Sequence, residues 1–318
     1  MRKPLLAAML CFAVLPVSGC SPNRKGAAES IDAAIEKLPG VASAEFEYDS
    51  GWPKGDERFN LTAVLKDNAT PDQAQALGKT FADLVAAKDF SAFDVILEVK
   101  YRVVDRINHV PMTSAATIGL PHGDGAGLPA ALQEWLSIAQ SPAVQSFRMS
   151  QADGEGTVEV TVDQNAKDTD LQALAKARPV LDHAQWIVTG GNLTQTDPFA
   201  EDYPGVYRVK GMIPDTALRE LWGRIVAEVG AAGGVTGETD MSRKEIPTTV
   251  EVNFLTSRNR EQNLAQAWMV LPLLQKLPQQ AKVDFDGALF VIGGCLPGEG
   301  GKSTAPLEVE LREKYEKC

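Results

Sequence analysis

The chain has 318 residues, of which 44% are hydrophobic and 23% are charged. These proportions are typical of globular proteins and exclude a disordered, collagen-like or coiled-coil chain, while the length corresponds to two or three domains. The 31 basic and 42 acidic side chains leave a net charge of −11, which argues against a nucleic-acid-binding surface.

The first residues of the chain have the pattern of an export signal. Basic Arg2 and Lys3 are followed by an almost wholly apolar run of 13 residues, from Leu5 to Val17. As a helix this run would be about 20 Å long, which is too short to span the hydrocarbon core of a bilayer. We therefore expect residues 1–19 to be a signal peptide and not a transmembrane anchor.

The segment Val17-Ser18-Gly19-Cys20 places small residues directly before a cysteine. With the preceding run it resembles the lipobox of bacterial lipoproteins. The resemblance implies cleavage before Cys20 and a diacylglyceryl thioether on its thiol, whose acyl chains, such as palmitate, would hold the protein on the membrane. An ordinary secretory signal that happens to precede a cysteine is the alternative. Cleavage would take the net charge from −11 to −13 and leave residues 20–28 as a polar tether.

The rest of the chain repeats one strand pattern. Thr157–Val162 recurs 92 residues later as Thr249–Phe254, and Phe59–Leu65 is a similar, earlier stretch. All three alternate apolar and polar residues, as half-buried strands do. Each follows turn residues and another short strand pattern, so each predicts a hairpin. The preceding strands are expected at residues 42–48, 144–151 and 235–241.

Helical patterns flank each of these hairpins. One helix is expected to begin at Thr70-Pro71, with an N-cap and a proline at its first position. Its counterparts after the other hairpins are expected at residues 168–181 and 259–277. The helices before the three hairpins are expected at residues 27–38, 128–139 and 215–232. A closing strand follows each unit, at residues 94–104, 185–189 and 282–292.

The resulting order is α-β-β-α-β, with leading strands expected at residues 112–120 and 206–210. This order is similar to that of the ferredoxin-like fold. The resemblance implies an α+β protein of three tandem ferredoxin-like (β)αββαβ modules, each an antiparallel sheet with helices on one face. The modules are expected at residues 29–110, 111–195 and 196–318. In the tail of the third, Pro306–Leu311 alternates like a strand and is expected to fill a vacant sheet edge.

Four cysteines are present. Cys11 would leave with the signal peptide, and Cys20 would carry lipid. In an exported, oxidising setting the remaining Cys295 and Cys318 are expected to form a disulfide, worth about 3 kcal/mol of stability in the chain-entropy model. A pair of free thiols is the alternative.

No catalytic residue can be named from motifs. The chain contains no HExxH pair, P-loop or nucleophile elbow. Gly123, Gly125 and Gly127 lack the βαβ pattern with a distal acid that a dinucleotide fingerprint requires, so we expect no metal and no cofactor. His122 and Asp124, in the glycine-rich segment 119–127, are candidate ligand contacts, although this segment also has the composition of a linker between modules. Trp52, in a predicted hairpin turn, is a candidate partner contact.

These observations favour a non-enzymatic, lipid-anchored protein on the exported side of the cell membrane. Its partner would be an unknown envelope protein or a small ligand, and not a nucleic acid. An envelope hydrolase with an unrecognised site is one alternative. The substrate-binding lipoprotein of an importer is another, but such proteins are expected to have parallel β-α-β units and not the hairpins predicted here.

Overall fold

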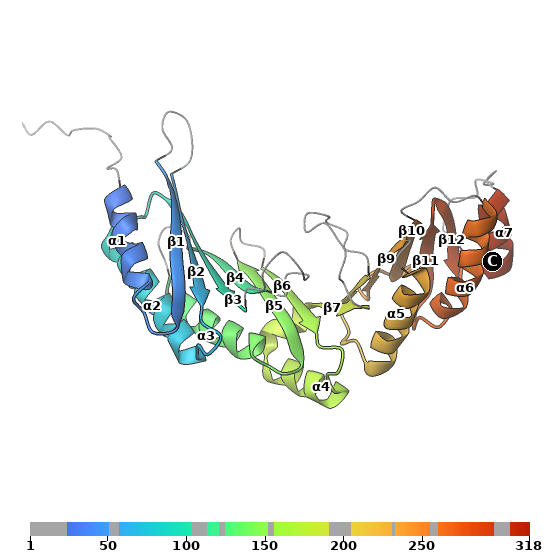
Figure 1. Cartoon of the computed structure of the whole chain (residues 1–318), viewed down its shortest axis with the longest axis horizontal. Coiled ribbons are helices and arrows are strands. Elements are labelled where there is room, and N and C mark those ends of the chain that lie inside the picture. The colour runs from blue at the N-terminus through green and yellow to red at the C-terminus, as the bar shows by residue number, and fades with distance from the viewer. Residues whose placement is uncertain are drawn as a thin grey trace, which may run out of the picture.

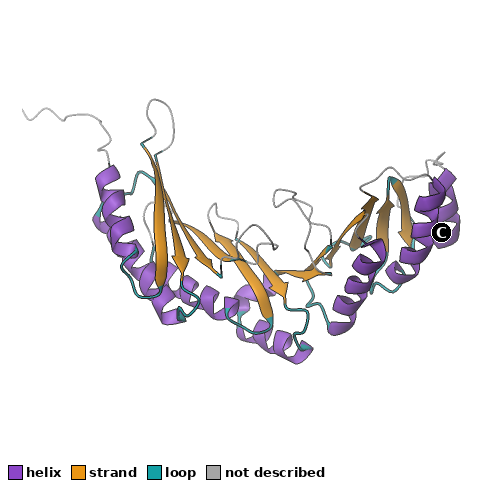
Figure 2. Ribbon diagram, in the orientation of Figure 1, coloured by secondary structure: helices purple, strands orange, loops and turns teal. Residues whose placement is uncertain are grey.

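The computed structural model describes residues 24–50, 57–102, 113–120, 125–151, 156–190, 205–230, 233–254, 260–295 and 306–318. Their strands form one 12-stranded sheet in which neighbours in space are also neighbours in the chain. The sheet is curved, and the helices lie along its convex face (Figures 1 and 2). The strands are β1 (Val41–Asp49), β2 (Arg58–Leu65), β3 (Asp94–Tyr101), β4 (Ser114–Leu120), β5 (Val144–Gln151), β6 (Thr157–Val162), β7 (Gln185–Thr189), β8 (Val206–Lys210), β9 (Gly233–Asp240), β10 (Thr248–Phe254), β11 (Ala281–Phe285) and β12 (Ala288–Ile292). The helices are α1 (Lys25–Ile35), α2 (Pro71–Ala87), α3 (Leu128–Ala139), α4 (Asp168–Ala177), the short 3₁₀ helix η2 (Pro179–His183), α5 (Thr216–Val229), α6 (Arg260–Leu274) and α7 (Pro306–Tyr315).

Parallel and antiparallel pairs alternate regularly across this sheet. The hairpins β1–β2, β5–β6 and β9–β10 are antiparallel. The strands joined through a helix, such as β2–β3, β6–β7 and β10–β11, are parallel neighbours. Antiparallel pairing of β3 with β4 and of β7 with β8 then joins each unit to the next. The protein is therefore a mixed α/β structure with one continuous sheet.

This arrangement corrects the expectation of separate antiparallel sheets. In the ferredoxin-like fold each helical crossover leaves room for a third strand between the two strands that it joins, which makes the sheet antiparallel. Two strands joined by a helical crossover run in the same direction. Here they are also direct neighbours in the sheet, so they form parallel pairs. The order of elements along the chain is the same in both cases, and the sequence pattern does not specify which strands become neighbours.

The period-two pattern of the strands places their apolar side chains beneath the helices. In β2, Phe59, Leu61 and Ala63 are fully buried, whereas the residues between them are partly exposed. The first residues of α2 form the expected cap, because Thr70 Oγ1 accepts from the Gln73 backbone N–H (3.3 Å) and the Gln73 side chain accepts from the Thr70 N–H (3.0 Å). Such capping boxes satisfy helix N–H groups that otherwise lack a partner.

The N-terminal helix begins earlier than the predicted tether allows. α1 starts at Lys25, and Ala28 is fully buried in the core, so the last residues of the 20–28 segment are helical. The Arg24 backbone N–H donates to the Tyr48 hydroxyl (2.9 Å), and the Arg24 guanidinium pairs with Asp89 (2.8 Å). Alanines favour the helix, and these contacts fix where it begins.

The closing strand expected at residues 282–292 is in fact the hairpin β11–β12. Its turn is Asp286-Gly287, and both residues have positive φ angles, 51° and 85°. An Asp-Gly pair between two apolar strands is a strong hairpin signal because a type I′ turn requires this conformation.

The expected strand at residues 306–311 is the start of helix α7. Leu311 and Tyr315, which lie four residues apart on one side of this helix, are buried. Arg312 forms i,i+4 ion pairs with Glu308 (3.5 Å) and Glu316 (3.2 Å). The alternating apolar residues therefore fit a helix as well as a strand, and packing together with these pairs selects the helix.

The C-terminal tail is held against the last strand of the sheet. Cys295 and Cys318 form the predicted disulfide, with their Cα atoms 5.1 Å apart. The Val291 N–H in β12 donates to the Glu316 carboxylate (3.2 Å), and the Lys317 N–H donates to the Gly294 carbonyl (3.0 Å). The tail thereby covers an edge that would otherwise expose unpaired backbone groups.

None of the helices in the described residues is long and apolar enough to cross a membrane.

Candidate functional site

The face of the sheet opposite the helices carries rows of side chains that are mostly polar. Register partners on neighbouring strands point to the same face, so each row can be followed from strand to strand. One row consists of Thr161, Ile187, Arg208, Glu238, Thr249 and Lys282. The next consists of Thr189, Val206, Thr236, Glu251, Asp284 and Leu289. We call this surface the open face.

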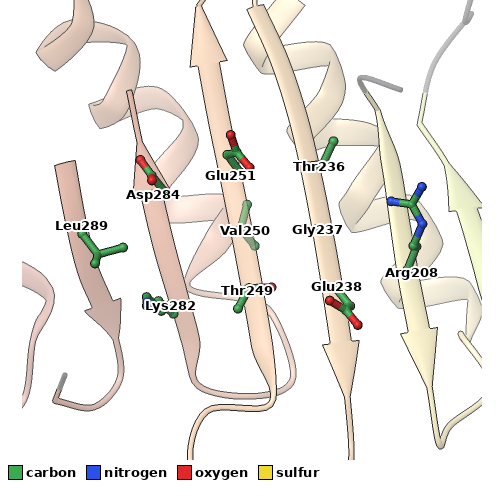
Figure 3. Close-up of a pocket in the computed structure, with 10 residues that line it drawn as sticks. All are labelled: Arg208, Thr236, Gly237, Glu238, Thr249, Val250, Glu251, Lys282, Asp284 and Leu289. Carbon is green, nitrogen blue, oxygen red and sulfur yellow. The ribbon is translucent and has the colours of Figure 1, made fainter. Parts of the chain in front are cut away.

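The open face contains a groove of about 430 Å³ over β8 to β12. Charged side chains of both signs line it, together with threonines and Leu289 (Figure 3). The charged residues are Arg208, Glu238, Glu251, Lys282 and Asp284. Its size lies within the range of small-ligand sites, and seven of its ten lining residues are polar or charged. The groove therefore suits a polar or charged ligand better than an apolar one.

Some of the charges in the groove are already paired within the protein. Glu238 forms an ion pair with Arg243 at 3.0 Å. At the end of β9, Asp240 accepts hydrogen bonds from the Ser242 hydroxyl (2.6 Å) and backbone N–H (2.9 Å), which hold the pKa of this carboxyl below its ordinary value. Among the described residues, Arg208 and Lys282 form no ion pair. Two cations of the groove thus remain available to a ligand.

The strands beneath the groove are supported from the helix side by buried polar contacts. The Tyr207 hydroxyl lies 2.6 Å from Thr239 Oγ1, which lies 2.7 Å from Thr248 Oγ1. The Tyr207 ring packs against Trp222 with centroids 4.6 Å apart, and the Trp222 indole N–H donates to the Gly205 carbonyl (2.9 Å). Burial raises the pKa of Tyr207. This network ties β8, β9 and β10 together and fixes the geometry of the groove.

The groove residues were only partly recognisable in the sequence. Glu251 lies within the repeated strand Thr249–Phe254, but the pattern indicated only a strand. Arg208 and Lys282 lie in predicted strands at positions that alternate with apolar residues, which indicates exposure and no more. The signal that was missed is the register between strands far apart in the chain, and this register depends on the tertiary fold.

The residues that were predicted from motifs mostly cannot be placed. Cys20, Trp52, His122 and Asp124 lie outside the described residues. Within the described part of the chain, no three His, Cys, Asp or Glu side chains are grouped so that they could hold a metal ion. The chain matches no family model, no curated protein and no solved structure.

Proposed function

We propose that this chain is a lipid-anchored protein of the bacterial cell envelope that binds a ligand or a partner through the open face of its sheet, without catalysing a reaction. The observation that carries the proposal is the groove over β8–β12, which is lined by charges of both signs on a face without helices. A sheet that packs between two layers has apolar residues on both faces. The polar rows of the open face instead fit contact with water or with a polar partner.

The proposed anchor is the lipobox-like segment that ends at Cys20. Arg24 is held in place by its contacts with Tyr48 and Asp89. Four residues of extended chain reach at most about 14 Å, so lipid on Cys20 would keep α1 close to the bilayer. The groove lies at the opposite end of the sheet (Figure 1). In this arrangement the protein would hold its ligand or partner away from the membrane surface.

We also propose that the sheet consists of three repeats of one (β)αββαβ unit, which share the order of elements of the ferredoxin-like fold. The recurring alternation of a hairpin, a helix and a parallel strand supports this interpretation. So does the strand pattern that recurs between β6 and β10. Repeats of this kind stack through neighbouring units and build extended surfaces.

The Cys20→Ala variant should lose lipid labelling and membrane attachment. Without the thiol no thioether can form, and no other anchoring group is proposed. Metabolic labelling with a palmitate analogue, followed by membrane fractionation, measures both effects. We expect labelling to fall to background and the protein to leave the membrane fraction. Cys295→Ser is the matched control and should remain labelled. Unchanged labelling of Cys20→Ala would refute the anchor.

Crosslinking in cells tests the binding function of the open face. A photoreactive amino acid at Thr249 would lie in the groove, whereas one at the exposed Glu220 would lie on helix α5. We expect discrete crosslinked products from position 249 and only background from position 220. If the partner belongs to the envelope, fewer of these products should form when the chain also carries Cys20→Ala. Equal products from the two positions would contradict a specific open face.

A further inference from the structure

Two acidic side chains lie directly opposite each other in the groove. Glu251 in β10 and Asp284 in β11 are register partners in the parallel pair of these strands. Neighbouring strands are about 4.8 Å apart, and Figure 3 shows the two carboxylates side by side at one end of the groove. Like charges that face each other across strands destabilise a sheet, so this pair calls for a compensating group.

Within the described part of the chain, these two carboxylates accept hydrogen bonds from neutral donors only. Glu251 accepts from the Asn253 side-chain amide, and Asp284 accepts from the Gly287 backbone N–H at 2.9 Å. Among the described residues neither carboxylate has a basic partner within ion-pair distance, whereas Glu238 in the same groove has Arg243. Among the described residues, no direct ion pair therefore neutralises the Glu251–Asp284 pair.

The two cations of the groove lie in the neighbouring row. Lys282 is two residues before Asp284 on the same face of β11, about 7 Å along the strand. Arg208 lies three strands away from Lys282 in the same row, about 14 Å at the usual spacing. The groove thus presents an acidic pair beside a stretch of the neighbouring row that begins with Arg208, opposite Glu238, and ends with Lys282.

We propose that the groove binds short peptides with free termini, which carry an ammonium group and a carboxylate. In this arrangement Glu251 and Asp284 hold the peptide ammonium between them, and Arg208, farther along the groove, attracts its carboxylate. An ammonium group donates three hydrogen bonds and neutralises the acidic pair, and charge-assisted hydrogen bonds are the stronger kind. This inference deepens the proposed binding function but does not depend on lipid at Cys20.

Calorimetric titration of the full chain with triglycine tests this assignment. We expect triglycine to bind and N-acetyl-triglycine to bind about tenfold more weakly, because acetylation removes the charged donor. Triglycine amide, which lacks the carboxylate, should also bind more weakly than triglycine. No binding of triglycine at millimolar concentration, or equal binding of the acetylated peptide, would overturn the proposal.

Variants of the acidic pair separate binding from folding. Glu251→Gln and Asp284→Asn should each weaken triglycine binding about tenfold. Both should unfold at the same or a slightly higher urea concentration, because a like-charge contact is removed while the amide keeps an acceptor oxygen. Glu45→Gln, in β1 outside the groove, is the matched control and should bind as the unaltered chain does.

Unchanged triglycine binding by Glu251→Gln and Asp284→Asn, or a clear loss of stability in both of these variants, would refute the role of the pair. A chain that is labelled at Cys20 yet fails to bind triglycine would overturn this inference and leave the proposed anchor standing.

Discussion

The Gly237→Val variant is expected to lose about 1–3 kcal/mol of its free energy of unfolding, which is the usual cost of overpacking a filled core. Gly237 lies in β9 directly opposite Tyr207 in β8. A Cβ atom at this position would overlap Tyr207 Cδ2 and lie 3.0 Å from Trp222 Cη2. Neither ring can move freely, because each is held by a hydrogen bond on the buried side of the sheet. Urea unfolding followed by tryptophan fluorescence measures the loss.

A second glycine provides the control for this variant. Gly223 lies in α5, and a Cβ atom there would meet nothing within 4 Å. Gly223→Ala should therefore be neutral or stabilise the protein by about 0.5–1 kcal/mol, because alanine favours the helix more than glycine does. If Gly237→Val unfolds at the same urea concentration as the unaltered chain, the packing of Tyr207 on Trp222 described above is wrong.

The local elements of this protein follow closely from its sequence. The cap at Thr70 and the alternating strands β2, β6 and β10 are all formed where their patterns predict them. These features depend on residues close together in the chain, such as the Thr70–Gln73 capping box. Local predictions were wrong at Asp286-Gly287, a turn within an expected single strand, at residues 306–311, where strand and helix patterns coincide, and at the start of α1, which lies within the predicted tether.

The neighbours of each strand could not be predicted in the same way. Whether a crossover joins adjacent strands depends on how its helix packs, and one such contact is visible between α2 and α3. A Cβ atom on Gly78 would lie 3.1 Å from Leu132 Cδ1 and from Pro129 Cα, so this glycine allows close approach of the two helices. This contact lies between two predicted modules. The sequence pattern within a single module therefore does not predict it.

The candidate site was beyond prediction for the same reason. Glu251 and Asp284 are more than 30 residues apart in the chain and meet only through the β10–β11 register. Each acid alone looks like an ordinary exposed position on a strand. Their opposition becomes visible only once the pairing of the strands is known, because a shift of one residue would move one of them to the helix side.

The Arg219→Ala variant is expected to lose about 2–3 kcal/mol of its free energy of unfolding, at the upper end of the usual cost of leaving a buried acceptor without its donor. The Arg219 side chain is 3% exposed and forms an ion pair with Asp168 at 3.2 Å. It donates to the Pro214 carbonyl (2.7 Å), to Thr216 Oγ1 (3.0 Å) and to the Ala166 carbonyl. Alanine would leave the buried Pro214 carbonyl without its donor and would also remove the two partly buried hydrogen bonds. Urea unfolding at neutral pH measures the effect.

Asp168→Asn is the informative comparison, because it removes the charge at the more exposed partner. Asp168 is 39% exposed, and its pKa is lowered first by the hydrogen bond from the Thr216 side chain and then, among other contacts, by Arg219. Its contribution to stability is therefore present above its unfolded pKa of about 3.8 and is lost as the pH falls through the lower folded value. We expect Asp168→Asn to cost much less than Arg219→Ala at neutral pH and to have a weaker dependence of stability on pH in the acid range.

The contacts of Arg219 also connect the second and third predicted modules. Ala166 lies before β7 and Pro214 after β8, so Arg219 joins backbone segments on the two sides of the predicted boundary at residues 195 and 196. If Arg219 couples the second and third units, its removal should increase amide hydrogen exchange in both α4 and α5. Increased exchange in α5 alone would show that Arg219 stabilises only its own helix. An unchanged unfolding free energy would show that the β7–β8 pairing alone holds the two units together.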